Sequence, residues 1–323
     1  MDTISAEVSL LGRICLLGIL LCFVVHFLDD RSLPRTRSSL IPSSSHRSDD
    51  DFYREPKKLA DCLGAPYLYV TVHDRTANVL KYSRDGCLLS DEVLIMDRSS
   101  SNSDIEFRSM AVGKHKGQEV LFIVDASNIN SRLLMYGKCL EDDNNYGRRP
   151  YIQTIAESNR NPGVDHAYGV CLDKDGNVYI SNQHTDCILR FQVGDFHPME
   201  FPHSLQLDHR VDYFTGTFVQ FGLPEEHVRD KQGLRSIVHV KSRIWIAHED
   251  LLGVAVVDID TGLVIDIIRL DVPIGLHFDE DSGLVFVSCK SDDGGMIYAL
   301  NYETYEIRNK YHHHKMEHPT GTV

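Results

Sequence analysis

The chain has 323 residues, of which 42% are hydrophobic and 25% charged, a composition typical of a folded protein with one large core. It carries 33 Lys and Arg against 47 Asp and Glu, which gives a formal net charge of −14. This acidic balance argues against a nucleic-acid partner and against wide contact with anionic lipid, because phosphate groups are bound by clustered basic side chains.

The N-terminal residues differ in composition from the rest of the chain. Residues 8–28 are apolar apart from Ser9, Arg13 and His26, and these 21 residues are long enough to cross a bilayer. A cleaved signal peptide is the competing interpretation, because the nearly uninterrupted apolar part, 14–28, has only 15 residues. Residues 25–29 lack the small side chains of a cleavage site, which favours an anchor. We therefore expect one N-terminal transmembrane helix within residues 1–28.

A flexible stalk is expected over residues 29–56. Residues 29–51 contain eight Ser or Thr and two Pro with few apolar side chains, so this segment cannot bury enough surface to become ordered. Four Arg in the same stretch would leave the C-terminal part in the cytosol by the positive-inside rule. Analogy with anchored luminal propellers points the other way, and we favour a single-pass protein of the secretory pathway whose folded part is luminal or extracellular rather than cytosolic.

From residue 57 onward, short apolar strands alternate with polar turns. Five copies share an apolar strand with a central aromatic or large residue, a polar turn and a second strand; their first strands are residues 67–71, 120–124, 178–181, 243–247 and 284–288. Their spacing is loose, as expected when loops of different length separate units of one antiparallel sheet each. A further strand is expected at residues 213–221, where apolar side chains recur.

The central copy, residues 166–191, resembles an NHL repeat. It carries an apolar strand with Gly169, the turn Asp173 to Asn177, an aromatic-centred strand around Tyr179, and a strand that ends at Phe191. The resemblance implies an all-β fold over residues 57–323: a β-propeller of five to six four-stranded blades, with its last blade complete or incomplete at the C-terminus. An unrelated antiparallel sandwich is the alternative.

The last residues match the start of the central copy. Residues 318–323, HPTGTV, share His and Gly at the same spacing with residues 166–171, HAYGVC. Two explanations remain open. The terminal segment either completes the sheet of the first unit and closes the ring, or it opens another blade that does not follow.

Superposing the copies places five residues just after the aromatic-centred strand: Val72, Asp125, Asn182, His248 and Cys289. Equivalent positions in successive blades form a ring about the propeller axis, and Asp125, Asn182 and His248 could there hold Ca²⁺ or polarise a water. Such a site would resemble those of calcium-dependent lactonase and esterase propellers. The alternative is that these side chains cap their own turns.

No Walker-type loop, nucleophile elbow or Cys-x-x-Cys pair occurs in the sequence. The sequence therefore favours a membrane-tethered propeller that acts as a binding or scaffold module for protein or small-molecule ligands on one rim, with no nucleic acid among its partners. A calcium-assisted hydrolase or lyase is the second hypothesis.

Overall fold

The fold is known from a computed structural model of residues 1–323. The structure describes residues 67–71, 79–83, 88–95, 105–115, 118–140, 147–158, 163–193, 214–221, 233–290 and 294–313. The predicted anchor, 1–28, and the predicted stalk, 29–56, lie outside these ranges. Among the described residues, no helix is both long and apolar enough to cross a membrane.

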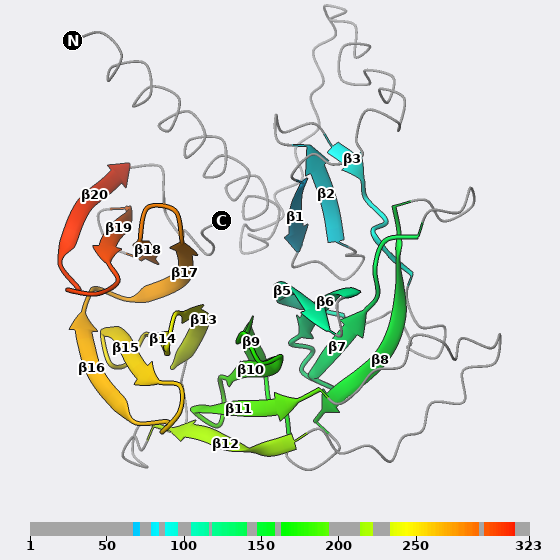
Figure 1. The fold of residues 1–323 in the computed structure, drawn as a ribbon, viewed down its shortest axis with the longest axis horizontal. Coiled ribbons are helices and arrows are strands. Elements are labelled where there is room, and N and C mark those ends of the chain that lie inside the picture. Colours follow the sequence, from blue (N-terminus) through cyan, green and yellow to red (C-terminus); the bar gives the residue numbers. More distant parts are fainter. Residues whose placement is uncertain are drawn as a thin grey trace, which may run out of the picture.

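The described part of the chain is all-β, with five sheets arranged side by side along an arc (Figure 1). The first sheet contains β1 (Tyr67–Thr71), β2 (Val79–Ser83) and β3 (Leu88–Ser90). The second contains β4 (Leu94–Ile95), β5 (Phe107–His115), β6 (Gln118–Asp125), β7 (Arg132–Tyr136) and β8 (Arg149–Glu157). Strand β4 pairs with β8 in parallel, and every other strand pair is antiparallel.

The remaining three sheets have four strands each, in simple sequential order. The third contains β9 (Ala167–Leu172), β10 (Asn177–Asn182), β11 (Cys187–Gln192) and β12 (Phe214–Gln220). The fourth contains β13 (Leu234–Val240), β14 (Arg243–His248), β15 (Gly253–Asp258) and β16 (Val264–Arg269). The fifth contains β17 (Pro273–Asp279), β18 (Leu284–Cys289), β19 (Gly295–Asn301) and β20 (Ile307–His313).

This arrangement is a five-bladed β-propeller, which confirms the predicted fold class at that level. Strands β5, β9, β13 and β17 lie on the inner side of the arc, and β8, β12, β16 and β20 lie on the outer side (Figure 1). The first strands of the five sequence copies correspond to β1, β6, β10, β14 and β18. The strand expected at 213–221 is β12, the outermost strand of the third blade.

Neighbouring blades are held together by separate hydrophobic clusters. One cluster joins the second and third blades through residues such as Phe122 and Ile180, and the next joins the third and fourth through Tyr179 and Ile246. Trp245, fully buried, belongs to the cluster between the fourth and fifth blades. Because each strand buries both faces, the strands in the middle of the blades are apolar along most of their length.

The four described innermost strands share one β-bulge at the same place. Phe107 of β5 lies opposite Asp125 of β6, and the next pair is Met110 opposite Ile123. Strand β5 therefore has one extra residue between these two pairs. The same shift occurs in β9, β13 and β17. The two residues within each bulge are a variable residue and a small one: Arg108-Ser109, Tyr168-Gly169, Arg235-Ser236 and Ile274-Gly275. A bulge redirects side chains locally, so the variable residues form an equivalent set near the axis.

We predict that Gly169→Ala lowers the free energy of unfolding by about 1–3 kcal/mol, because a Cβ there would lie 2.9 Å from Ile237 N and 3.0 Å from Arg235 O of the next blade. Urea unfolding followed by circular dichroism measures this. Gly163→Ala is the matched control: its Cβ would meet no described atom closer than Ser158 O, at 3.5 Å. Equal stability of the two variants would contradict tight packing at the bulge.

Candidate functional site

The three predicted site residues lie at equivalent strand ends, as the superposed copies required. Asp125 ends β6, Asn182 ends β10 and His248 ends β14, and each side chain is buried. Val72 lies outside the described residues, and Cys289 is buried at the end of β18.

Asp125 holds the turn between β6 and β7. Its Oδ1 accepts hydrogen bonds from Glu106 N at 2.9 Å and from Ser127 N at 3.1 Å. Its Oδ2 accepts from Arg132 Nη2 at 2.6 Å and Nε at 3.1 Å, a charge-assisted pair with two bonds. Both carboxylate oxygens are therefore bonded within the second blade.

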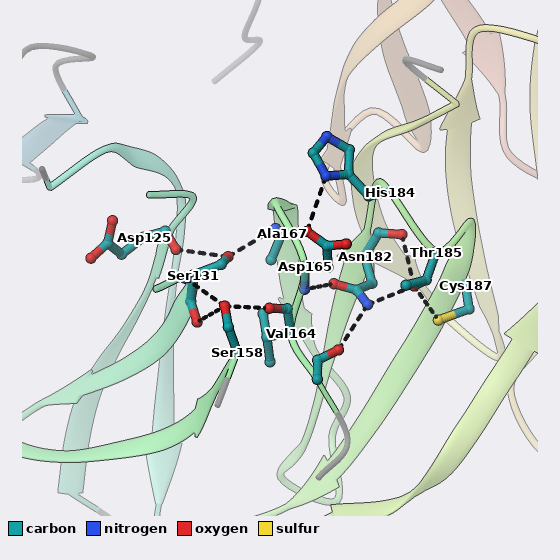
Figure 2. Close-up of polar contacts among 11 residues, drawn as sticks. Asp125, Ser131, Ser158, Val164, Asp165, Ala167, Asn182, His184, Thr185 and Cys187 are labelled. Atoms are coloured by element: carbon teal, nitrogen blue, oxygen red, sulfur yellow. Dashed lines mark hydrogen bonds and ion pairs between the residues drawn. The ribbon is translucent and has the colours of Figure 1, made fainter. Parts of the chain in front are cut away.

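Asn182 plays the same part in the third blade (Figure 2). Its Oδ1 accepts from Asp165 N at 2.6 Å, and its Nδ2 donates to Gly163 O at 3.2 Å and to Thr185 Oγ1 at 2.6 Å. These bonds join the segment before β9 to the turn after β10. The Asn182 side chain thus links two segments within the third blade.

His248 connects two blades. Its Nε2 lies 3.1 Å from Asp186 Oδ1, which belongs to the third blade, and its Nδ1 accepts from Leu251 N at 3.4 Å. The ring also packs edge-on against Phe221, with 5.1 Å between the ring centroids. All three predicted residues therefore bond groups of the turns that follow their strands, as the alternative interpretation, in which they cap these turns, expects.

In the part of the chain that the structure describes, no three His, Cys, Asp or Glu side chains converge closely enough to hold a metal ion. A hard cation such as Ca²⁺ takes six to eight oxygen ligands, and the oxygens of Asp125 and Asn182 already accept hydrogen bonds. The calcium site stays a prediction.

Hydroxyl groups join the second and third blades at the same end of the sheets (Figure 2). Ser131 Oγ donates to Asp125 O at 3.0 Å and accepts from Ala167 N, in the third blade, at 3.1 Å. Ser158 Oγ bonds both Ser131 O, at 3.2 Å, and Val164 O, at 2.7 Å. The strand ends that carry Asp125 and Asn182 are therefore fixed relative to each other.

A second group of polar side chains comes from the bulges. Tyr168 of the third blade contacts two guanidinium groups, with Arg108 Cζ 5.4 Å and Arg235 Cζ 4.9 Å from the centre of its ring. Arg108 pairs with Glu106, and Arg235 pairs with Glu249, with 3.0 Å between Nε and Oε1. Cation–π contact and ion pairing together fix both guanidinium planes.

These residues are partly accessible. The Arg108 side chain is 24% exposed and that of Arg235 is 14% exposed, whereas Tyr168 is buried at 8%. They come from three neighbouring blades and occupy one equivalent position, so they lie at the inner edge of the propeller. The group Arg108, Tyr168 and Arg235 is called the arginine–tyrosine cluster below.

Two histidines lie next to this cluster. The rings of His166 and His184 are stacked, with centroids 4.7 Å apart, and His184 Nδ1 lies 3.0 Å from Asp165 Oδ1. Burial lowers the pKa of His166, and the positive charge of Arg108 lowers it further. The imidazole of His166 is thus kept neutral near neutral pH.

Sequence reasoning did not find the arginine–tyrosine cluster. Its members are spaced irregularly along the chain and have different side chains, so no motif marks them. The available signal was the small residue that follows each of them, Ser109, Gly169 and Ser236, at the start of an apolar strand. These small residues can be recognised as equivalent only when the shared bulge is known.

Comparison with known proteins supports the fold and leaves the family open. No family model matches the chain, and no curated protein matches it in sequence. In structure it resembles the nidogen/laminin complex, with 11% identity over 80% of each chain and a TM-score of 0.51. It also resembles a protein of unknown function from Bacteroides caccae, with 14% identity over 77% of this chain and 73% of that one and a TM-score of 0.46.

A third similar structure is virginiamycin B lyase from Staphylococcus aureus, with 8% identity over 77% of this chain and 67% of that one and a TM-score of 0.44. Identities this low show a shared fold alone. The resemblance to NHL repeats is therefore confirmed as far as the β-propeller fold, and no further.

We predict that Asp125→Ala lowers the free energy of unfolding by about 3 kcal/mol, because it leaves the Arg132 charge and two backbone N–H groups without their acceptor. Urea unfolding in calcium buffer and in chelator checks this, with the exposed Asp281→Ala as control. A turn-capping role predicts the same loss in both buffers. A loss that occurs only with calcium would contradict it and support the metal site.

We also predict a pH dependence from His166. Because its pKa is lowered in the folded protein, the unfolded state binds the proton more tightly, and stability falls as the pH decreases below the ordinary value of 6.5. His166→Asn, which tolerates the backbone φ of 48° at this position, should make this fall shallower. Unfolding free energies of the native protein and the variant, measured on both sides of pH 6.5, test this prediction. Burial also lowers the pKa of His277, but this residue is present in both proteins, so the difference between them reports His166 alone. An unaltered fall in the variant would refute the prediction.

Proposed function

We propose that this protein is a propeller-type binding module that holds its ligand at the arginine–tyrosine cluster. The observation that supports this most directly is the contact of both Arg108 and Arg235 with the ring of Tyr168, at one position of three adjacent blades. Side chains that share a blade position converge at the axis, where ligands of propellers are reached by several blades at once.

The chemistry of the cluster favours a ligand with acceptor oxygens. Guanidinium groups donate in a rigid, planar fork that matches carboxylate and carbonyl groups. Glu106 and Glu249 hold the two guanidinium planes in place, so little side-chain entropy is lost when a ligand binds. The neutral His166 beside Arg108 adds a nitrogen that can donate or accept. We propose an organic carboxylate, or a peptide segment with an acidic side chain.

The arrangement supports recognition more than chemistry. Each arginine of the cluster is paired with a glutamate, so its charge is presented in a fixed place. The calcium-assisted hydrolase remains the alternative, and the Asp125→Ala comparison in calcium and chelator separates the two.

We further propose that the propeller is tethered to a membrane through residues 8–28, with the propeller on the luminal or extracellular side. The support is the apolar composition of that stretch. The full-length protein should stay with membranes during an alkaline carbonate wash, and protease added to sealed vesicles should spare a luminal propeller. Release of the full-length protein by the wash would contradict the tether.

We predict that organic carboxylates raise the melting temperature of the protein and that Arg108→Lys weakens their binding about tenfold. Lysine keeps the charge but loses one charge-assisted bond of the planar fork, worth about 1.5 kcal/mol. Citrate, glutarate and a short acidic peptide serve as probes in thermal-shift titrations. Arg308→Lys is the control, because Arg308 lies on the outer strand β20, pairs with Glu306 and has a side chain that is 51% exposed. Equal effects of the two substitutions would contradict the site.

A further inference from the structure

We propose that the ligand of the arginine–tyrosine cluster is a protein segment in which one acidic side chain is flanked on both sides by apolar side chains. The assignment rests on the proposed function and narrows it to one class of partner. The observation behind it is a pair of exposed apolar side chains, Ile129 and Leu252, on the turns that follow β6 and β14.

Both side chains come from the end of the blades that carries the cluster. The last residues of β6 and β14 lie opposite the first residues of the innermost strands β5 and β13. Arg108 and Arg235 lie in the bulges directly after those first residues. Ile129 and Leu252 lie in the turns directly after β6 and β14. The two turns therefore border the cluster, one on the second blade and one on the fourth.

The exposure of these side chains is related to the site. Ile129 is 71% exposed and Leu252 is 52% exposed. Single exposed apolar side chains are common on protein surfaces, but these two occupy corresponding turns of the blades that neighbour Tyr168. Apolar side chains that surround a polar site are a feature of surfaces that bind a protein partner.

Leu252 is exposed in a strained conformation. Its φ is 46°, in the left-handed region that a branched side chain rarely adopts. Glycine or asparagine would fit the same turn with less strain. The N–H of Leu252 donates to Glu249 O at 2.9 Å, so the conformation belongs to the turn itself. A leucine that is both strained and exposed is explained by contact with a partner.

The same two turns hold the acidic residues that orient the guanidinium groups. Glu249, which pairs with one of the arginines, is the first residue of the turn after β14. In the turn after β6, Ile129 N donates to Ser127 Oγ at 3.3 Å. Ser127 N and Glu106 N both donate to Asp125 Oδ1. The apolar side chains and the guanidinium groups therefore have positions that are set before a ligand binds.

The separation of the two turns indicates the kind of ligand. The third blade packs between the second and the fourth, and packed sheets lie about 10 Å apart, so the turns are roughly 20 Å from each other. A small carboxylate is too short to contact both. An extended peptide covers this separation with about six residues. An acidic side chain in the middle of such a segment would meet the guanidinium groups of Arg108 and Arg235.

Fluorescence anisotropy with the full-length protein tests the proposal. The probe is a labelled, blocked peptide of about seven residues with a central glutamate, a leucine at each end and serine elsewhere. We expect it to bind about tenfold more tightly than the same peptide with serine at both ends, because the leucines become partly buried against the turns. Equal affinities of the two peptides would overturn the proposal.

Variants of the two turns locate the contact. Ile129→Ser and Leu252→Asn, which tolerates the φ at this position, should each weaken binding of the leucine peptide roughly threefold and leave binding of the serine peptide unchanged. Leu263→Ser is the matched control, because Leu263 is 65% exposed and follows β15, whereas Leu252 precedes it. Equal losses in all three variants, or no loss in the first two, would contradict the contact.

Two further measurements separate the alternatives. Sedimentation velocity should show one species without peptide; a dimer that dissociates in Ile129→Ser and Leu252→Asn would make a second copy the occupant and overturn the proposal. Citrate that raises the melting temperature, together with equal affinities for the two peptides, would leave the proposed function standing and overturn this inference alone. Failure of citrate and of both peptides to bind would overturn both.

Discussion

The close approach of each innermost strand to the next blade is the constraint on which the rest of the structure depends. It is clearest at Gly169, where a Cβ would come within 3.1 Å of three atoms and where Ser181 Oγ bonds both strands. Two blades are thereby joined through backbone groups rather than through side-chain packing alone. Tyr168 and Arg235 lie in the bulges that accompany this contact, so blade assembly and site geometry have one cause.

The sequence was informative wherever local chemistry decides the structure. The turn from Asp173 to Asn177 and the alternation of short apolar runs predicted strands β9 to β11, because hairpin turns and buried strands have strong composition signals. The recurrence of the same pattern predicted the propeller and the equivalent strand ends at Asp125, Asn182 and His248. The hydrogen-bond partners of Asp125 and Asn182 could not be predicted from the sequence, because they include backbone N–H groups that the fold brings close.

The arginine–tyrosine cluster could not be predicted, because a bulge breaks the two-residue alternation on which sequence reasoning relies. Arg108 and Arg235 read as ordinary polar residues at the start of a strand. Their position beside Tyr168 depends on the register of three separate sheets. The proposed site therefore depends on tertiary structure, in which Glu106 and Glu249 hold two guanidinium groups against one aromatic ring.

Amide hydrogen exchange is the most direct test of the contact between blades. We predict that the amide of Gly169 exchanges only on global unfolding in the native protein. In Ser181→Ala, which removes the hydroxyl bonded to both strands, that amide should exchange faster, while the amide of Gly275, bonded to Ser288, keeps its protection. Exchange of Gly169 in the native protein as fast as that of the exposed turn residue Asp175 would contradict the account.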